Sequence, residues 1–149
     1  MIIDDVARQL SAAQADGCGS SFERAAAIPG MFLTWCVNLG LISDELARRE
    51  ESRILRLKYR DITGGEFLVS ACGGMLDASM LSANGLSFAR ENYEAFELAA
   101  REMIEMPIED NWVHYDRMAP WLTEKYLGRK GSRKRANKRG WRGWLGWRK

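Results

Sequence analysis

His114 is the only histidine of the chain, and it lies in a segment rich in carboxylates. Asp110 precedes it by four residues, a spacing that places both side chains on one face if the segment is helical. Glu109 and Asp116 lie beside this pair. A carboxylate and an imidazole together can bind a metal ion or move a proton. A metal site needs three or more converging ligands, and this segment has no second histidine and no cysteine, so we expect neither a metal nor another cofactor.

The same residues have two other interpretations. Glu109, Asp110 and Asp116 could stabilise the positive end of a helix dipole, with His114 simply exposed. They could instead contact a basic partner, with the neighbouring Trp112 as an aromatic anchor inside a charged rim. Trp112 at helical spacing is also compatible with the core. Our candidate partner-binding residues are therefore Glu109, Asp110, Trp112, His114 and Asp116.

No catalytic motif accompanies these residues. The chain has neither the glycine-rich phosphate loop nor the G-x-S-x-G turn of serine hydrolases. Cys18, Cys36 and Cys72 are odd in number and far apart, which argues against disulfides and a zinc cage. We predict no catalytic residues and a protein that is not an enzyme. A small enzyme that uses His114 with Asp110 and Asp116 is the least favoured alternative.

Charge is divided unequally along the chain. Residues 1–124 contain 11 Lys and Arg against 20 Asp and Glu, a net charge of −9. Residues 125–149 contain 11 Lys and Arg and no acid. We therefore expect an acidic domain over residues 1–127 and a basic, Trp-containing tail over residues 128–149. The acidic domain suits a basic partner surface, and the tail suits a polyanion.

The tail has three possible roles. Its positive charges would displace counterions from a nucleic acid, and its indoles could stack on unpaired bases. An anionic membrane surface attracts the same residue types. The tail could also fold back on the acidic domain or stay solvated. The candidate polyanion-binding residues are Arg133, Lys134, Arg135, Lys138, Arg139, Trp141, Arg142, Trp144 and Trp147.

Apolar residues recur at helical spacing, and no run with a period of two is evident. We expect a core helix with one apolar face that ends at Gly40, and Pro29 must lie in its first turn or kink it. Its capping residues would be Ser20 and Glu23. Further helices are expected from Ser43 to about Tyr59, after the capping pair Thr63 and Glu66, and over Leu86–Met103. A last helix is expected from Trp112 to Tyr126, and Pro120 must either kink it or begin a fresh turn.

A weaker helix is expected from the amino terminus to Ala15, and a turn over Asp77–Ser82. The predicted fold class is a single all-α domain of five or six helices. No secretion signal and no membrane-spanning stretch is evident, so we expect a cytoplasmic protein without a transmembrane segment.

Three blocks resemble a family of small bacterial cytosolic domains associated with polymorphic-toxin immunity genes. They are residues 22–41, where Trp35 precedes Asn38-Leu39-Gly40-Leu41, residues 63–93, and residues 109–122 with Trp112, Tyr115, Asp116 and Pro120. The resemblance implies a fold and a genomic association with toxin-immunity genes, not a mechanism, and it brings no catalytic residues. Pro29 and the Trp-rich tail depart from the family pattern.

Two functions follow as hypotheses. The first is an immunity-type protein that occludes a cognate toxin or effector through its acidic surface, steered by opposite charge towards a basic active site. The alternative is an accessory protein that binds nucleic acid or a membrane surface through the tail.

Overall fold

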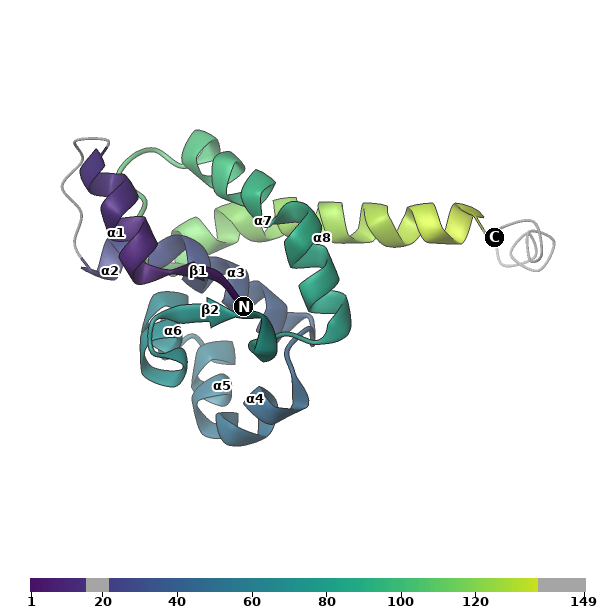
Figure 1. The fold of residues 1–149 in the computed structure, drawn as a ribbon, viewed down its shortest axis with the longest axis horizontal. Helices are drawn as coiled ribbons and strands as arrows, with labels where there is room; N and C mark the ends of the chain where they lie inside the picture. The colour runs from purple at the N-terminus through teal and green to yellow at the C-terminus, as the bar shows by residue number, and fades with distance from the viewer. Residues whose placement is uncertain (16–21, 137–149) are drawn as a thin grey trace.

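The computed structural model describes the backbone of residues 1–15 and 22–136 and the side chains of residues 1–12 and 22–128. These ranges form eight α-helices, a 3-10 helix and two short strands (Figure 1). The predicted helical fold is confirmed in this coarse form, although the helices are more numerous than expected. The elements are β1 (Ile2–Asp5), α1 (Val6–Ala15), α2 (Phe22–Ala25), α3 (Ala27–Asn38), α4 (Asp44–Arg49), α5 (Glu51–Lys58), α6 (Gly64–Cys72), β2 (Met75–Asp77), η1 (Ala78–Met80), α7 (Ala83–Met103) and α8 (Trp112–Ala136). Among the described helices, none combines the length and the hydrophobicity that a membrane span requires.

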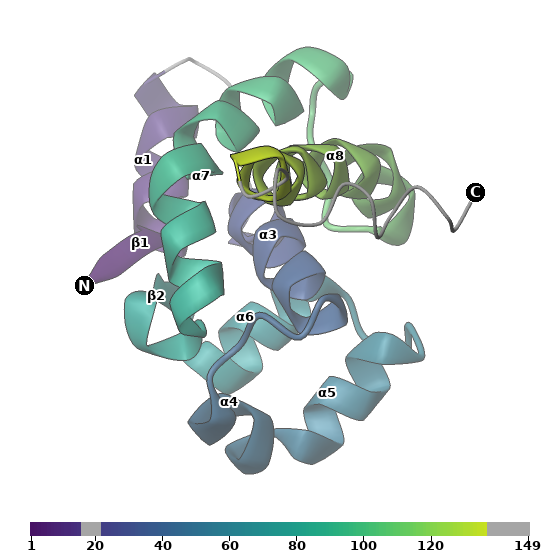
Figure 2. The ribbon, with the colours of Figure 1, turned by 90° about the vertical axis from the view of Figure 1, so that its right-hand side faces the viewer.

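Helix α3 is the centre of the fold, and it packs against α5, α6, α7 and α8 (Figure 2). Every residue from Ala27 to Val37 is buried. The predicted core helix is confirmed. The prediction of a single buried face is wrong, because neighbouring elements cover the helix on all sides. Aromatic rings from α3 itself and from α7 surround Phe32, including Phe88 at 6.2 Å and Tyr93 at 5.0 Å between ring centroids.

The two ends of α3 follow from proline and glycine. Because the helix begins at Ala27, Pro29 lies in its first turn, where a missing N–H costs little. At the other end Gly40 adopts a φ of 71°, and the N–H of Leu41 donates to the carbonyl of Cys36 at 2.8 Å. This is the glycine-dependent helix stop that the sequence predicts. Ser20, the expected cap, lies outside the described residues.

Helices α3 and α6 approach each other at glycines. A methyl group added at Gly30 would lie 2.6 Å from the backbone nitrogen of Gly65, and one at Gly64 would lie 2.5 Å from the carbonyl oxygen of Gly30. Gly64 and Gly65 therefore allow the backbones to pack closely as well as starting α6. The capping box of Thr63 and Glu66 is present at this start, as predicted.

The amino terminus is the main correction to the predicted fold. Residues 2–5 form β1, which pairs antiparallel with β2, and a register irregularity lies between Ile2 and Asp4. Helix α1 therefore begins at Val6, where the side chain of Asp5 accepts a hydrogen bond from the N–H of Arg8 at 2.6 Å. The strand shows no alternating pattern in the sequence because its buried residue is the charged Asp4, with 1% of its surface exposed.

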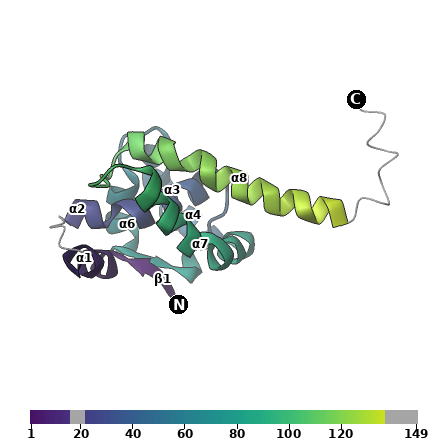
Figure 3. The ribbon, with the colours of Figure 1, turned by 90° about the horizontal axis from the view of Figure 1, so that it is seen from above.

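The remaining helices lie where the sequence predicts them, with two differences in their bounds. The helix expected from Ser43 to Tyr59 is divided at Glu50, which has a φ of −115° between α4 and α5. Helix α7 contains the helix predicted over Leu86–Met103, and η1 lies in the turn expected over Asp77–Ser82. Helix α8 contains Pro120 and continues to Ala136, projecting from the rest of the fold (Figure 3). The expected domain boundary between residues 127 and 128 thus lies within a helix.

Candidate functional site

Asp110 links the segment before α8 to the start of α6. Its Oδ1 accepts a hydrogen bond from the N–H of Gly65 at 2.9 Å, and its Oδ2 accepts one from the hydroxyl of Thr63 at 2.6 Å. Burial raises the pKa of this carboxyl, and the nearby carboxylates of Glu66 and Glu23 raise it further. Asp110 is therefore a structural contact whose negative charge is crowded by two others.

His114 does not share a helical face with Asp110, because α8 begins only at Trp112. The expected four-residue pairing is therefore wrong. The Nδ1 of His114 instead accepts a hydrogen bond from the backbone N–H of Glu109 at 2.9 Å. The backbone N–H of His114 donates to the side-chain oxygen of Asn111 at 2.7 Å. These bonds fix the turn that starts α8. In the described part of the chain, no three His, Cys, Asp or Glu side chains converge as metal ligands.

Asp116 forms a two-pronged ion pair with Arg60, with distances of 2.7 and 3.0 Å. The guanidinium lies 4.4 Å from the ring centroid of Trp112, a cation–π geometry. The same pairing lowers the pKa of Asp116. Glu109 likewise pairs with Arg24 at 3.2 Å. Of the five predicted partner-binding residues, the three carboxylates thus all have a partner within the chain.

A groove between α2 and α6 collects carboxylates beside apolar side chains. Its volume is about 380 Å³, and Asp110 forms one of its walls. We call it the acidic groove; its principal lining residues are Phe22, Glu23, Ala26, Glu66, Val69 and Asp110. Phe22 is half exposed at 50%. Only Asp110 belongs to the predicted site. Glu23 and Glu66 were noticed in the sequence solely as capping residues, and nothing in the sequence brings α2 next to α6.

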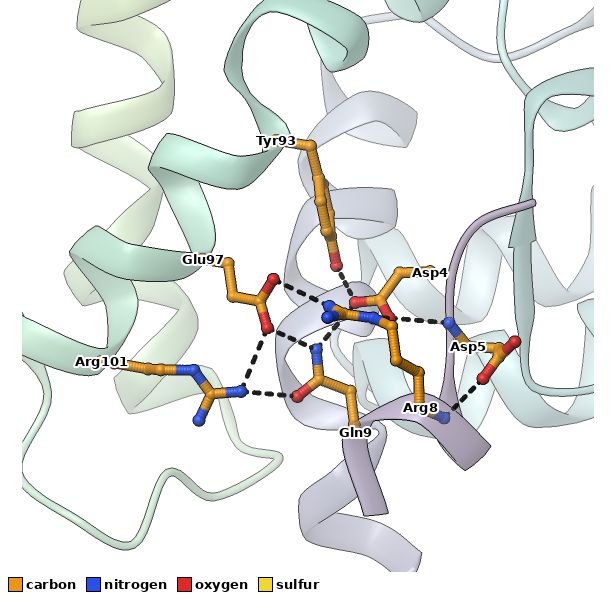
Figure 4. A network of polar contacts seen from close by, with 7 residues as sticks. All are labelled: Asp4, Asp5, Arg8, Gln9, Tyr93, Glu97 and Arg101. Carbon is orange, nitrogen blue, oxygen red and sulfur yellow. Dashed lines mark hydrogen bonds and ion pairs between the residues drawn. The ribbon is translucent and has the colours of Figure 1, made fainter. Parts of the chain in front are cut away.

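A second polar cluster joins the amino terminus to α7 (Figure 4). We call it the clamp; it comprises Asp4, Arg8, Gln9, Tyr93, Glu97 and Arg101. The buried carboxylate of Asp4 accepts hydrogen bonds from Arg8 at 2.7 Å, from Gln9 at 2.8 Å and from the hydroxyl of Tyr93.

The outer half of the clamp is built around Glu97. This carboxylate binds Arg8 at 2.8 Å, Gln9 at 3.0 Å and Arg101 at 3.1 Å. Burial raises the pKa of Tyr93 well above its ordinary value, and the charge of Asp4 adds to this effect. Both carboxylates are thus compensated by donors from α1 and α7, and the clamp holds β1 and α1 onto α7.

Most residues of the predicted tail site lie outside the residues that the structure describes. Arg133, Lys134 and Arg135 lie on the last turns of α8, where only the backbone is described. The other predicted tail residues, Lys138, Arg139, Trp141, Arg142, Trp144 and Trp147, lie outside the described residues. Their role stays a prediction.

Comparison with known proteins places the described body in one family. A family model described as a domain of unknown function, DUF7832, matches residues 2–117. This match runs from β1 to the first turns of α8 and includes the clamp and the acidic groove. No curated protein and no solved structure matches the chain.

Proposed function

The chain belongs to the DUF7832 family, and we propose that its acidic helical body is a binding module that captures a basic segment of a partner protein. The partner we favour is a toxin or effector that the protein neutralises by occlusion. The acidic groove carries this proposal, since it combines a hollow of about 380 Å³ with three carboxylates and an exposed aromatic ring.

The electrostatics of the groove favour a cation. Burial raises the pKa of Asp110, and the charges of Glu66 and Glu23 raise it further, so each of these two carboxylates repels an ionised Asp110. A lysine or arginine side chain that enters the groove would place a positive charge beside Asp110 and so relieve this repulsion. Phe22 and Val69 offer apolar surface to the methylene stem of such a side chain.

The rest of the body supports the same partner class. The net charge of −9 over residues 1–124 would steer a basic protein towards the groove and speed its association at low salt. Nuclease and nucleotide-using active sites tend to be basic, so a helical body docked over one would block it. Phe22 at the rim would supply the aromatic anchor that binding interfaces favour.

The test uses the product of a toxin-like gene adjacent to the gene for this chain. We expect a tight 1:1 complex, protection of cells that express the toxin, and slower association as salt rises from about 50 to 300 mM. Glu23→Gln together with Phe22→Ala should weaken binding by about tenfold or more. Glu94→Gln, an exposed change on α7, is the matched control and should bind as the wild type does. Absence of both complex and protection would disprove the proposal.

A further inference from the structure

Positive charge within the acidic body is concentrated on α4 and α5. Of the 11 Lys and Arg in residues 1–124, six lie between residues 48 and 60. Three of these, Arg49, Arg53 and Arg56, line a hollow of about 380 Å³ together with Glu50 and Ser52. We propose that this arginine hollow binds the phosphate group of a small ligand. This site and its ligand are separate from the acidic groove and from the proposed function.

The spacing of the arginines places them on one side of the α4–α5 segment. Arg53 and Arg56, three residues apart on α5, lie on one face of that helix, and Arg49 at the end of α4 lines the same hollow across the break at Glu50. The lining carries three positive charges and one negative charge. A net charge of that size attracts an anion with more than one negative charge, which a phosphate monoester or a pyrophosphate provides.

Glu50 positions two of the arginines. Its side chain is only 10% exposed, and it accepts hydrogen bonds from Arg49 at 3.1 Å and from Arg53 at 2.6 Å. The two arginines lower the pKa of Glu50, which therefore stays ionised at neutral pH. Arg49 is fixed further by a 3.1 Å hydrogen bond to the carbonyl of Ala71 on α6. Two guanidinium groups are thus held in place before any ligand arrives.

Hydrogen-bonding capacity remains after these contacts. A guanidinium has five N–H donors, and the bonds to Glu50 and Ala71 use only part of those of Arg49 and Arg53. Arg56 has no ion-pair partner in the described part of the chain, although it lines the hollow. The hydroxyl of Ser52 adds a further donor. These groups match the fork geometry by which arginine recognises phosphate oxygens.

The size of the hollow indicates a small molecule. Pockets for small ligands range from about 300 to 1,000 Å³, and this hollow lies near the lower limit. Inorganic phosphate, pyrophosphate and the phosphate chain of a nucleotide share the required chemistry. Their relative affinities distinguish a free phosphate from a nucleotide.

The experiment is a titration of the ¹⁵N-labelled full-length protein with phosphate, pyrophosphate and ADP at constant ionic strength. We expect saturable shifts of the backbone amides of residues 49–56. Arg56→Gln leaves the bonds of Glu50 intact and should weaken pyrophosphate binding by about tenfold, the loss expected for one charge-assisted contact. Arg53→Gln combined with Arg56→Gln should abolish the shifts. Arg90→Gln, an exposed arginine on α7, is the matched control and should leave them unchanged.

Two results would overturn the proposal. One is the absence of saturable shifts over residues 49–56, including the case in which shifts occur only in the basic residues 125–149. The other is an equal loss of affinity in Arg56→Gln and Arg90→Gln, which would indicate general charge attraction. Equal affinity for pyrophosphate and ADP would show that the site recognises only the phosphate groups. Tighter binding of ADP would show that it recognises a nucleotide. Either result supports the site.

Discussion

The clamp and the acidic groove both contain clustered carboxylates, but the fold surrounds these carboxylates differently. In the clamp, Asp4 and Glu97 are surrounded by donors from Arg8, Gln9 and Arg101, so the charges are compensated inside the fold. In the groove, Asp110 faces two further carboxylates that raise its pKa. The comparison shows that a count of acidic residues does not separate carboxylates that the fold compensates from carboxylates that lie beside other carboxylates. What separates them is whether the fold supplies the compensating cation.

The strongest test of the comparison is removal of the clamp's central charge. Asp4→Ala leaves Arg8, Gln9 and Tyr93 without their shared acceptor in a buried position, so we expect a loss of about 3–5 kcal/mol of unfolding free energy. Urea unfolding followed by circular dichroism measures this loss. Glu94→Ala on the exposed face of α7 is the control and should change stability by less than about 0.5 kcal/mol. If the two variants were equally stable, the clamp would contribute nothing to the fold.

The clamp also marks the limit of what the sequence reveals. Its bonds join residues up to 92 positions apart, and no local pattern encodes such a pairing. Tyr93 lies within the helix predicted over Leu86–Met103, but its hydroxyl partner Asp4 lies on a strand that the sequence did not indicate. The missed strand and the missed network therefore have one cause, a buried charge where an apolar residue would have shown the pattern.

Local signals were predicted well for the opposite reason. The capping box at Thr63 and the helix stop at Gly40 depend on residues within a few positions of each other, and both are present. Of the candidate site, the sequence identified the carboxylates before α8 but could not show that Arg60 and Arg24 neutralise two of them. It also could not place Phe22 and Glu23 opposite Glu66.

An intermediate effect is expected at the wall of the groove. A methyl group at Gly65 would lie 2.6 Å from Cγ of Asp110, so Gly65→Ala must displace the Asp110 side chain and weaken its bonds to Thr63 and Gly65. We expect a loss of about 1–3 kcal/mol of unfolding free energy, together with weaker binding of the basic partner.

The matched control for this change is Gly128→Ala on α8, where the added methyl group would meet no described atom within 4 Å apart from the neighbouring residues and backbone of the helix itself. This variant should be more stable than the wild type by roughly 0.5–1 kcal/mol, because alanine favours the helix. Thermal unfolding of both variants measures the difference. A Gly65→Ala protein as stable as the wild type would show that Asp110 can move without cost and that the groove is not a rigid site.

The smallest effect is expected for an ion pair on the surface. Arg60 and Asp116 are 47% and 55% exposed, so water and salt screen their attraction, and Asp116→Asn should cost less than about 1 kcal/mol of unfolding free energy.

The pairing with Arg60 lowers the pKa of Asp116 in the folded protein. Its contribution is therefore complete above the ordinary aspartate pKa of 3.8 and disappears as the pH falls through the lower folded value. Unfolding measured at pH 7 and near pH 3, at low and high salt, should show the largest difference between wild type and Asp116→Asn at pH 7 and low salt, and a smaller one at lower pH or higher salt. A difference as large as that of Asp4→Ala would mean that exposed and buried carboxylates contribute alike, which would remove the distinction between the clamp and the rest of the acidic surface.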